Sequence, residues 1–410
     1  MKDSENGFKE TELGPLPEDW NVVKLGEVCE VIMGQSPPGK TYNTEGNGVP
    51  FLQGKAEFGD IYPTHIKYTT KPLKIALPNT VLISVRAPVG DVNLTNIIYC
   101  IGRGLASLSL KNSNNFYLFY CLAYLKPLLE KQGTGSTFMA INKSKLERFP
   151  IPLPPLSEQE RIAGVLSAIQ GVIEKTEKVI RANRELKRSL MKHLFTYGPV
   201  PVNNVDSVNL KDTEIGNIPQ HWNVVKLGEV CEVIMGQSPP GKTYNTEGNG
   251  VPFLQGKAEF GDIYPTHIKY TTKPLKIALP NTVLISVRAP VGDVNLTNII
   301  YCIGRGLASL SLKNSNNFYL FYCLAYLKPL LEKQGTGSTF MAINKSKLER
   351  FPIPLPPLSE QERIVEVLCA VDEKIQAEER KKKSLEVLFR SMLHYLMSGK
   401  IRVNNLNIEG

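Results

Sequence analysis

The sequence has little of the material that enzymes and metal-binding proteins commonly use. Histidine occurs only five times in 410 residues, and none of the seven cysteines lies in a Cys-x-x-Cys pair. There is no Gly-x-Gly-x-x-Gly sequence, and we interpret "SPPG" at Ser36–Gly39 as a turn and expect no phosphate-binding loop. These absences predict a chain that carries no catalytic or metal centre of its own.

Long apolar runs are also missing. The most apolar stretch, "FYLFYCLAYL", ends at Lys126 and is too short to span a membrane, and the N-terminal "MKDSENGFKE" contains no apolar signal core. An odd number of cysteines without paired spacing indicates buried, reduced thiols. We therefore expect a cytoplasmic protein that is neither secreted nor inserted into a membrane.

What the chain does contain is one long internal repeat. Residues 20–162 and 222–364 are identical at all 143 positions, at a constant offset of 202. The preceding segments are only similar ("TELGPLPEDW" and "TEIGNIPQHW"), and the copies diverge at once afterwards, where Ala163 faces Val365. The chain is thus a tandem of two units. Its sharp edges indicate a recent duplication, a recombination or an engineered origin, and the sequence leaves these three open.

The net charge of +9 is concentrated in particular segments. Each identical copy contains 15 Lys and Arg against 10 Asp and Glu, and residues 163–200 contain seven against three. A positive charge placed in this way suits a polyanion such as DNA. Because many basic proteins bind no nucleic acid, charge alone leaves both interpretations open.

Each copy has the pattern of a compact α+β domain followed by a helix. Short β-rich runs ("VPFL", "TVLISV", "NIIYC", "LASLSL") alternate with loops, and "NNFYLFYCLAYLKPLLEKQ" predicts a helix. The prolines of "FPIPLPPLSEQERI" then favour an extended arm, after which Ser157 and Glu160 predict an N-cap and capping box. We predict a first domain over 1–156, a helix over 157–197, a second domain over 198–358, a helix over 359–398 and a tail over 399–410.

The two predicted helices carry apolar heptads that indicate a coiled coil. Because the seam of the first helix is polar near its centre and the second is polar across "QAEERKKK", we favour antiparallel pairing; two independent surface helices are the alternative. The predicted seam of the first helix consists of Ile162, Val165, Ile169, Val172, Thr176, Val179, Asn183, Leu186 and Leu190. That of the second consists of Ile364, Val367 or Leu368, Val371, Ile375, Leu385, Leu388, Met392 and Leu396.

The order of domain, "PLPPLSEQERI" and long helix, present twice, resembles the specificity (S) subunit of type I restriction-modification systems. The stretches "GQSPPGKTY", "ISVRAPVGD", "CIGRGLASL" and "GTGSTF" fit the target-recognition domains of that family. The resemblance covers essentially the whole chain. It implies an α+β fold with two identical globular target-recognition domains, separated by two long helices that form an antiparallel coiled coil with pseudo-twofold symmetry.

The resemblance also implies a function. Each domain would recognise one half of a bipartite site on double-stranded DNA, and the helices would bind methyltransferase (M) subunits, two of them, in a complex joined by restriction (R) subunits. S-adenosylmethionine, ATP and Mg would belong to those partners, with no cofactor in this chain, which also lacks the Asn/Asp-Pro-Pro-aromatic signature of adenine methyltransferases. Identical domains predict an inverted-repeat site. An enzyme, or a DNA-binding regulator or adaptor without methyltransferase partners, is the alternative.

Glycine-rich loops supply the candidate DNA contacts, because they combine backbone donors for phosphates with polar side chains for base edges. Lys40 and Lys55 are the phosphate candidates, and Gln53 has the amide that can bind adenine. Three alternative interpretations stay open. One is that Arg86 and Arg103 pin buried turns, another that Tyr42 only packs against its neighbours, and a third that "GTGSTF" is a structural hairpin. We expect His65 and His267 to be packing or surface residues. The predicted DNA-binding residues are Gln35, Ser36, Lys40, Tyr42, Gln53, Lys55, Arg86, Arg103, Ser136 and Thr137, with Gln237, Ser238, Lys242, Tyr244, Gln255, Lys257, Arg288, Arg305, Ser338 and Thr339 in the second copy.

Overall fold

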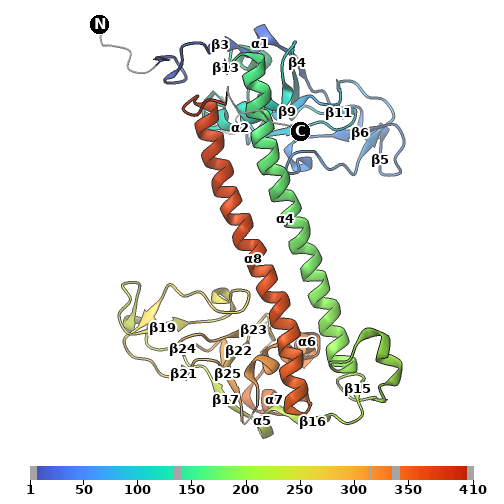
Figure 1. Ribbon diagram of the computed structural model, residues 1–410, viewed down its shortest axis with the longest axis vertical. Helices are drawn as coiled ribbons and strands as arrows, with labels where there is room; N and C mark the ends of the chain where they lie inside the picture. The colour runs from blue at the N-terminus through green and yellow to red at the C-terminus, as the bar shows by residue number, and fades with distance from the viewer. Residues whose placement is uncertain (1–6, 133–139, 314, 335–341, 404–410) are drawn as a thin grey trace. The chain divides into compact units, whose positions relative to one another are not determined.

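The computed structural model describes residues 7–132, 140–313, 315–334 and 342–403 (Figure 1). The chain divides into two compact units, one formed by residues 1–177 and 380–410 and the other by residues 178–379. Each unit therefore contains one copy of the repeat together with part of both long helices. Four predicted contact residues lie outside the described residues: Ser136, Thr137, Ser338 and Thr339.

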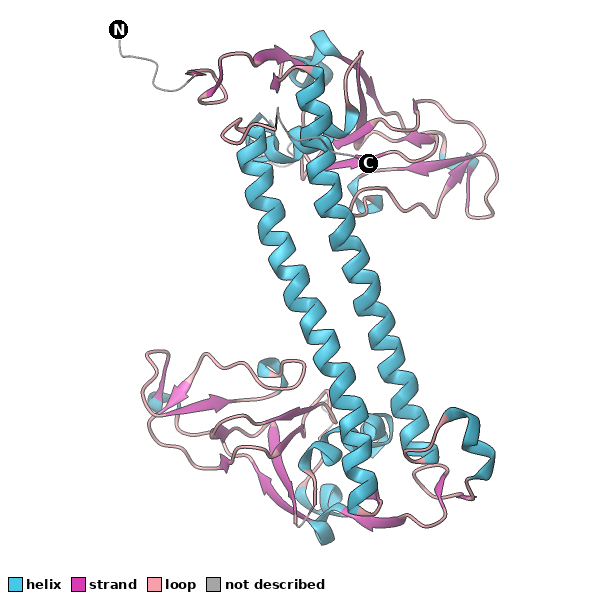
Figure 2. Ribbon diagram, in the orientation of Figure 1, coloured by secondary structure: helices cyan, strands magenta, loops and turns pink. Residues whose placement is uncertain are grey.

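The repeat domain of the first unit is built around two larger sheets and one covering helix (Figure 2). The antiparallel four-stranded sheet has the order β10-β9-β12-β4, and the five-stranded sheet has the order β5-β7-β6-β11-β8, in which β6 and β11 are parallel. Helix α2 (Asn115–Gln132) packs on the four-stranded sheet. The strands are β4 Cys29–Met33, β5 Tyr42–Asn43, β6 Val49–Leu52, β7 Tyr68–Thr69, β8 Ile75–Ala76, β9 Val81–Ser84, β10 Val92–Leu94, β11 Tyr99–Ile101 and β12 Leu105–Leu110.

The main core lies between the four-stranded sheet and α2. All four residues of β9 are buried, which explains why its sequence "VLIS" is continuously apolar up to its last residue instead of alternating. On the helix, the aromatic and leucine residues from Tyr117 to Leu122 are almost fully buried. The predicted strands and helix of each copy are confirmed to within a few residues at each end.

Short elements at the base of the domain join its two chain ends. Strand β3 (Asn21–Lys24) pairs antiparallel with β13 (Pro150–Leu153), so the proline-rich arm is a strand of a two-stranded sheet. Such a position tolerates proline because few of its N–H groups are needed for pairing. The other short strands and helices of this unit include β1 Phe8–Lys9, β2 Leu16–Pro17, α1 Leu25–Val28 and α3 Lys143–Glu147.

The predicted capping box is wrong. Helix α4 (Leu156–Tyr197) begins before Ser157, because the carbonyl of Pro155 already accepts the first helical hydrogen bond from the N–H of Gln159. The polar residues of "SEQE" bind elsewhere: the Oε1 of Gln159 accepts from the Oγ of Ser113 at 2.5 Å, which ties the helix start to the loop before α2. The repeated junction is therefore a point of attachment between the helix and its own domain.

The second unit repeats these elements with the same pairing and register. A short 3-10 helix, Val202–Ser207, precedes its first strand, and helix α8 (Leu358–Met397) follows its last. The elements are β14 Leu210–Lys211, β15 Ile218–Pro219, β16 Asn223–Lys226, α5 Leu227–Val230, β17 Cys231–Met235, β18 Tyr244–Asn245, β19 Val251–Leu254, β20 Tyr270–Thr271, β21 Ile277–Ala278, β22 Val283–Ser286, β23 Val294–Leu296, β24 Tyr301–Ile303, β25 Leu307–Leu312, α6 Asn317–Gln334, α7 Lys345–Glu349 and β26 Pro352–Leu355.

Helices α4 and α8 pair antiparallel within each unit. In the second unit the Nη2 of Arg184 lies 2.5 Å from Glu379, and the Nζ of Lys187 lies 2.6 Å from Asp372. Residues later in α4 therefore pair with residues earlier in α8, as in an antiparallel pair. In the first unit, Lys382 pairs with Glu177. The predicted antiparallel coiled coil is confirmed, and these charged pairs lie near the polar centres of the two helices.

One half of the predicted seam of α4 is in the wrong register. Ile162 and Thr176 of the predicted seam are buried, and Ile169, Asn183 and Leu190 are partly buried. Val172, Val179 and Leu186, by contrast, are 39–48% exposed. The buried series instead lies one residue later along the chain. It consists of Leu166, Ile173, Ile180, Lys187 and Leu194, four of which are buried and one of which pairs with a buried aspartate.

Lys187 is the reason that the sequence pattern points to the wrong series. A lysine interrupts the true seam, whereas the exposed series is apolar throughout. The lysine is accommodated because Asp372, itself 6% exposed, binds its ammonium group, which also lies 5.2 Å from the ring centroid of Tyr322. In α8, Leu368 rather than Val367 is buried, and Leu388 is exposed, against expectation.

Candidate nucleic-acid interface

Three segments that are distant in sequence meet at one edge of each repeat domain. The N–H of Gln35, just after β4, donates to the carbonyl of Ile101 at 2.9 Å. The N–H of Arg103, in the turn between β11 and β12, donates to the Oγ of Ser36 at 3.3 Å. The end of β6 reaches the same turn through a bond from Gly102 to the carbonyl of Leu52. This edge, defined by Gln35, Ser36, Gln53 and Arg103, is called the loop edge below.

Glycine is required where these segments cross. A Cβ atom on Gly34 would lie 2.2 Å from the carbonyl oxygen of Gly102, and one on Gly104 would lie 2.8 Å from that of Gln53. Backbone atoms cannot give way at such distances. The glycines of "GQSPPG" and "IGRG" therefore allow three backbone segments to approach closely, which brings the side chains between them to one surface.

Arg86 joins this edge from the end of β9. Its backbone forms an isolated bridge with Ala140, and the N–H of Val85 donates to the carbonyl of Gly104 at 2.9 Å. The turn that follows is held by Ser84, whose Oγ donates to the carbonyl of Pro88 and accepts from the N–H of Asp91.

Both arginines of this region are exposed. Within the described ranges, neither Arg86 nor Arg103 has a side-chain hydrogen-bond or ion-pair partner. Their turns are held by backbone groups and by serine hydroxyls, so the interpretation that these guanidinium groups pin buried turns is wrong. Two fork-shaped donors are thus presented to solvent at the loop edge.

The two predicted phosphate ligands differ in their surroundings. Lys40 is exposed in the 3-10 helix Gly39–Thr41. Lys55, beside Gln53, instead forms a 2.6 Å ion pair with Asp91, which also binds Lys126 at 2.7 Å. Sequence reasoning missed Asp91, although "PVGDV" marks it as an acidic residue directly after a turn glycine.

Asp91 is ionised and shared between two lysines. Burial by itself would raise the pKa of its carboxyl group, but the hydrogen bonds from Lys126 and Lys55 together hold that pKa below the ordinary value. The arrangement joins the turn before β10, the loop after β6 and helix α2. Lys55 is therefore already paired with a carboxylate of its own domain.

Two other predicted residues serve packing. Tyr42 stacks on Phe51 with ring centroids 4.8 Å apart, and its hydroxyl donates to the carbonyl of Pro37 at 2.8 Å. These contacts agree with the alternative in which Tyr42 is a packing residue. His65 lies against Tyr68 and Tyr99, edge to face, as expected of a packing residue. The second copy has the same contacts.

The run from Gly34 to Thr41 matches the letters Gly-x4-Gly-Lys-Thr of a phosphate-binding loop, a match that the sequence expectation passed over. The structure differs from such a loop in each essential part. Pro37 and Pro38 have no N–H groups to donate, and Gly39–Thr41 leads into strand β5 instead of an α-helix. The Oγ of Thr41 is turned inward, against Pro38 and Thr69.

The loop edge recurs in the second unit with the same geometry. The N–H of Gln237 donates to the carbonyl of Ile303 at 2.9 Å, and the N–H of Arg305 donates to the Oγ of Ser238 at 3.3 Å. The backbone of Arg288 forms a bridge with Ala342. Across the described part of the chain there is no cluster of three or more potential metal ligands, and no helix there is long and apolar enough to cross a membrane.

Comparison with known proteins identifies the family. Residues 17–182 and 219–387 match the type I restriction modification DNA specificity domain. The chain belongs to this family. Members of it are the non-catalytic specificity subunits of type I restriction-modification complexes.

Two relatives and two solved structures each match more than nine-tenths of the chain. A putative type I restriction enzyme MjaX specificity subunit of Methanocaldococcus jannaschii is 38% identical, with 97% of each chain covered. The MjaVIII specificity subunit of the same organism is 28% identical over 98% of each chain. In a structure described as the basis of complex assembly and conformational transition of the type I R-M system, a chain with 30% identity superposes with a TM-score of 0.57, covering 94% of this chain and 99% of that one. The S subunit from M. genitalium, 18% identical, shares the fold, with a TM-score of 0.65 and coverage of 92% and 96%.

Proposed function

We propose that this specificity subunit recognises a bipartite DNA site through the loop edges of its two repeat domains. The observation that carries the proposal is the set of exposed polar groups converging there, with two arginines and two glutamines beside close-packed backbones. Arg103 has the fork geometry that binds guanine, and Gln53 has the amide that binds adenine. The further contacts proposed are those of the sequence analysis, including Lys40 as a phosphate ligand.

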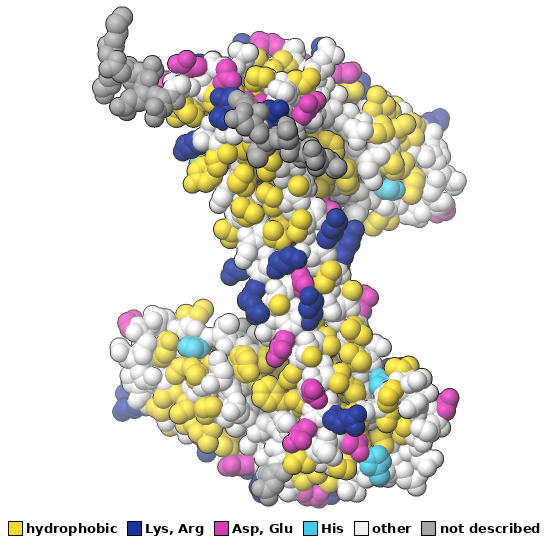
Figure 3. All heavy atoms as spheres, viewed as in Figure 1, with side chains coloured by type: hydrophobic (Ala, Val, Ile, Leu, Met, Phe, Trp, Pro, Cys, Tyr) yellow, Lys and Arg dark blue, Asp and Glu magenta, His cyan; other side chains and the backbone are white. Residues whose placement is uncertain are grey.

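Positive charge beyond the loop edge supports binding to a polyanion. Exposed Lys and Arg side chains lie along the paired helices (Figure 3). On α4 they recur every three or four residues, which places many of them on one side of the helix. They are Lys175, Lys178, Arg181, Arg184, Arg188 and Lys192.

The two half-sites are proposed to have the same sequence, because the two repeat domains are identical. Each domain starts one of two helices that pair antiparallel, so the domains are expected to approach the duplex in opposite directions. The target is then an interrupted inverted repeat. Half-sites about one helical turn apart, roughly 10 base pairs, would place both domains on one face of the DNA.

The exposed apolar series of α4 is proposed to bind the methyltransferase subunits. Val172, Val179 and Leu186 recur at heptad spacing on the side of the helix that α8 does not cover. A series of this kind is the usual contact for a partner helix. S-adenosylmethionine, ATP and Mg would reside on the methyltransferase and restriction subunits.

Reconstitution tests this function. The chain, mixed with its cognate methyltransferase subunit and S-adenosylmethionine, is expected to direct methylation of specific sites, and neither component alone should do so. Stable DNA binding by the chain alone, with no association with methyltransferase subunits, would instead indicate a DNA-binding regulator. Methyl transfer by the purified chain alone would indicate an enzyme.

A further inference from the structure

The two junctions have the same sequence, but the equivalent glutamate of each has different hydrogen-bond partners. In the first unit, Glu158 accepts from the Nε1 of Trp20 at 2.9 Å and from the Nε and Nη2 of Arg402 at 2.7 and 2.9 Å. Its side chain is only 1% exposed. The outer side of the same guanidinium binds Asp19 through Nη1 and Nη2 at 3.0 and 2.6 Å. The arginine is thus held between two carboxylates.

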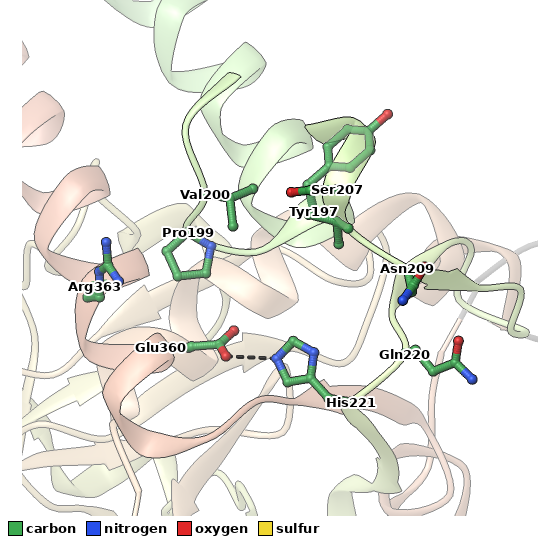
Figure 4. A pocket seen from close by; sticks show the side chains of 10 residues that line it. Tyr197, Pro199, Val200, Ser207, Asn209, Gln220, His221, Glu360 and Arg363 are labelled. Atoms are coloured by element: carbon green, nitrogen blue, oxygen red, sulfur yellow. Dashed lines mark hydrogen bonds and ion pairs between the residues drawn. The ribbon is translucent and has the colours of Figure 1, made fainter. Parts of the chain in front are cut away.

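In the second unit the equivalent glutamate is more open. Glu360 accepts from the Nε1 of Trp222 at 2.8 Å, through the same oxygen as in the first unit, and its other oxygen lies 2.7 Å from the Nε2 of His221 (Figure 4). The side chain of Glu360 is 24% exposed. From the described residues it receives two hydrogen bonds, whereas Glu158 receives three.

The difference comes from sequence outside the identical copies. Gly399 and Gly198 follow the ends of the two long helices, both with positive φ, and lie against Trp20 and Trp222 respectively. Three residues after the first glycine is Arg402, but three residues after the second is Pro201. The second unit therefore has no arginine of its own at this place, and its histidine stands where the first unit has Asp19.

A pocket of about 520 Å³ lies beside Glu360, within the size range of small-ligand sites. Figure 4 shows its lining side chains coming from the end of α4, the connecting segment and the start of α8. Tyr197, Pro199 and Val200 form an apolar wall, and Ser207 and Gln220 add polar groups.

We propose that this pocket binds a guanidinium group, with Glu360 in the role that Glu158 has toward Arg402. A guanidinium presents parallel N–H donors that match the two oxygens of a carboxylate, and the first unit shows this pairing at an identical glutamate. The apolar wall suits the methylene stem of an arginine-like ligand. The group belongs either to a free guanidino compound or to an arginine side chain of a partner protein.

Two neighbouring side chains limit the affinity. His221 occupies the glutamate oxygen that the Nε of Arg402 binds in the first unit, so an incoming guanidinium competes with it. Arg363, an exposed residue that also lines the pocket, lies on the other side of Glu360 from His221 in Figure 4 and adds a like charge. Weak binding of the isolated group is therefore expected.

Titration of the full-length chain with N-ethylguanidinium, followed by NMR, tests the proposal, with ethylammonium as the control cation. The wild type should bind one equivalent, and Glu360→Gln should weaken this binding about tenfold or more, as expected for loss of charge-assisted hydrogen bonds. His221→Ala should strengthen it. Arg402→Ala provides a matched control, because it opens the equivalent site: this variant should bind a second equivalent, at Glu158.

Two further results separate the sources and decide the proposal. If a partner's arginine is the natural ligand, Glu360→Gln weakens assembly with the methyltransferase subunit and N-ethylguanidinium competes with assembly. If a free compound is the ligand, assembly is unchanged while the titration result holds. Binding of N-ethylguanidinium to Arg402→Ala but not to the wild type would overturn the proposal, since the opened site shows that the probe works. A failure of DNA recognition would leave the titration unaffected.

Discussion

The N–H of Gln35 and the carbonyl of Ile101 form a 2.9 Å hydrogen bond across 66 positions of sequence. This bond holds the residue after β4 against the turn that carries Arg103, and it recurs between Gln237 and Ile303. Because it uses only backbone atoms, the frame of the loop edge does not depend on the identity of the exposed side chains. Substitutions of those side chains are therefore expected to change binding without unfolding the domain.

Replacing Arg103 and Arg305 together by Ala should weaken binding to the cognate site by about 1–3 kcal/mol per half-site. Binding to unrelated DNA should change much less, because base contacts carry the specificity. Fluorescence anisotropy with cognate and scrambled duplexes measures both. The matched control is Lys111→Ala with Lys313→Ala, exposed lysines at the opposite end of the same strands. Equal losses on both duplexes would show that these arginines contact phosphates only.

Reversing the charge of Lys40 and Lys242 together should weaken binding to all DNA sequences alike. Each lost phosphate contact lowers the slope of log affinity against log salt by about 0.9. Titrations at several salt concentrations measure this slope, and Lys24 with Lys226 serves as the exposed control pair. An unchanged slope in a folded variant would show that Lys40 is only solvated surface.

Ile173→Ala should destabilise the chain by about 2–5 kcal/mol, whereas Val172→Ala, one residue away, should cost less than about 1 kcal/mol. Ile173 is 7% exposed in the helix seam, and Val172 is 40% exposed. Urea unfolding gives both values. A greater loss for Val172 would restore the register that the apolar pattern alone suggests. Assembly with the methyltransferase subunit should instead be weakened more by Val172→Ala than by Ile173→Ala.

Asp372→Ala should cost about 3–5 kcal/mol, because it leaves the ammonium group of Lys187 without its buried partner. The pair of Glu177 and Lys382, in which both side chains are about 30% exposed, is the comparison. Glu177→Ala should cost at most about 1 kcal/mol. Equal effects in denaturant unfolding would contradict the view that the two ion pairs differ in burial and therefore in stability.

The ion pairs of Asp91 and Asp293 predict a dependence of stability on pH. Since the lysines hold the pKa of these carboxyl groups below the unfolded value, their contribution is present above that value, about 3.9, and is lost as pH falls through the folded pKa. Asp91→Asn with Asp293→Asn should therefore be less stable than the wild type at pH 7. At a pH below the folded pKa the difference should largely disappear. Urea unfolding at both pH values decides this.

The repeat, the strands and the pairing of the helices could be predicted because each rests on local pattern. The β-rich runs at residues 49–52 and 105–110 are bounded by turn residues, and the prolines of "PLPPL" prevent a helix from continuing through it. The seam register could not be predicted, since the buried position of Lys187 depends on Asp372, which lies 185 residues away. The partners of Glu158 and Glu360 were equally hidden, because they come from segments outside the identical copies.

For the candidate site, the exposed arginines and glutamines were found from glycine-rich loops, but their convergence was not. It depends on strand order, in which β6 and β11 lie side by side although β7 to β10 separate them in sequence. Asp91 was missed for the same reason: its two lysines are 36 and 35 positions away.

Sequencing of methylated DNA from cells that carry the complete complex shows whether the two repeat domains recognise the same half-sequence. Two identical domains predict that the methylated sites form an interrupted inverted repeat, with the same half-sequence on opposite strands and a modified base in each half. Two unrelated half-sequences, or a direct repeat, would contradict the account of two identical DNA-reading domains joined by antiparallel helices.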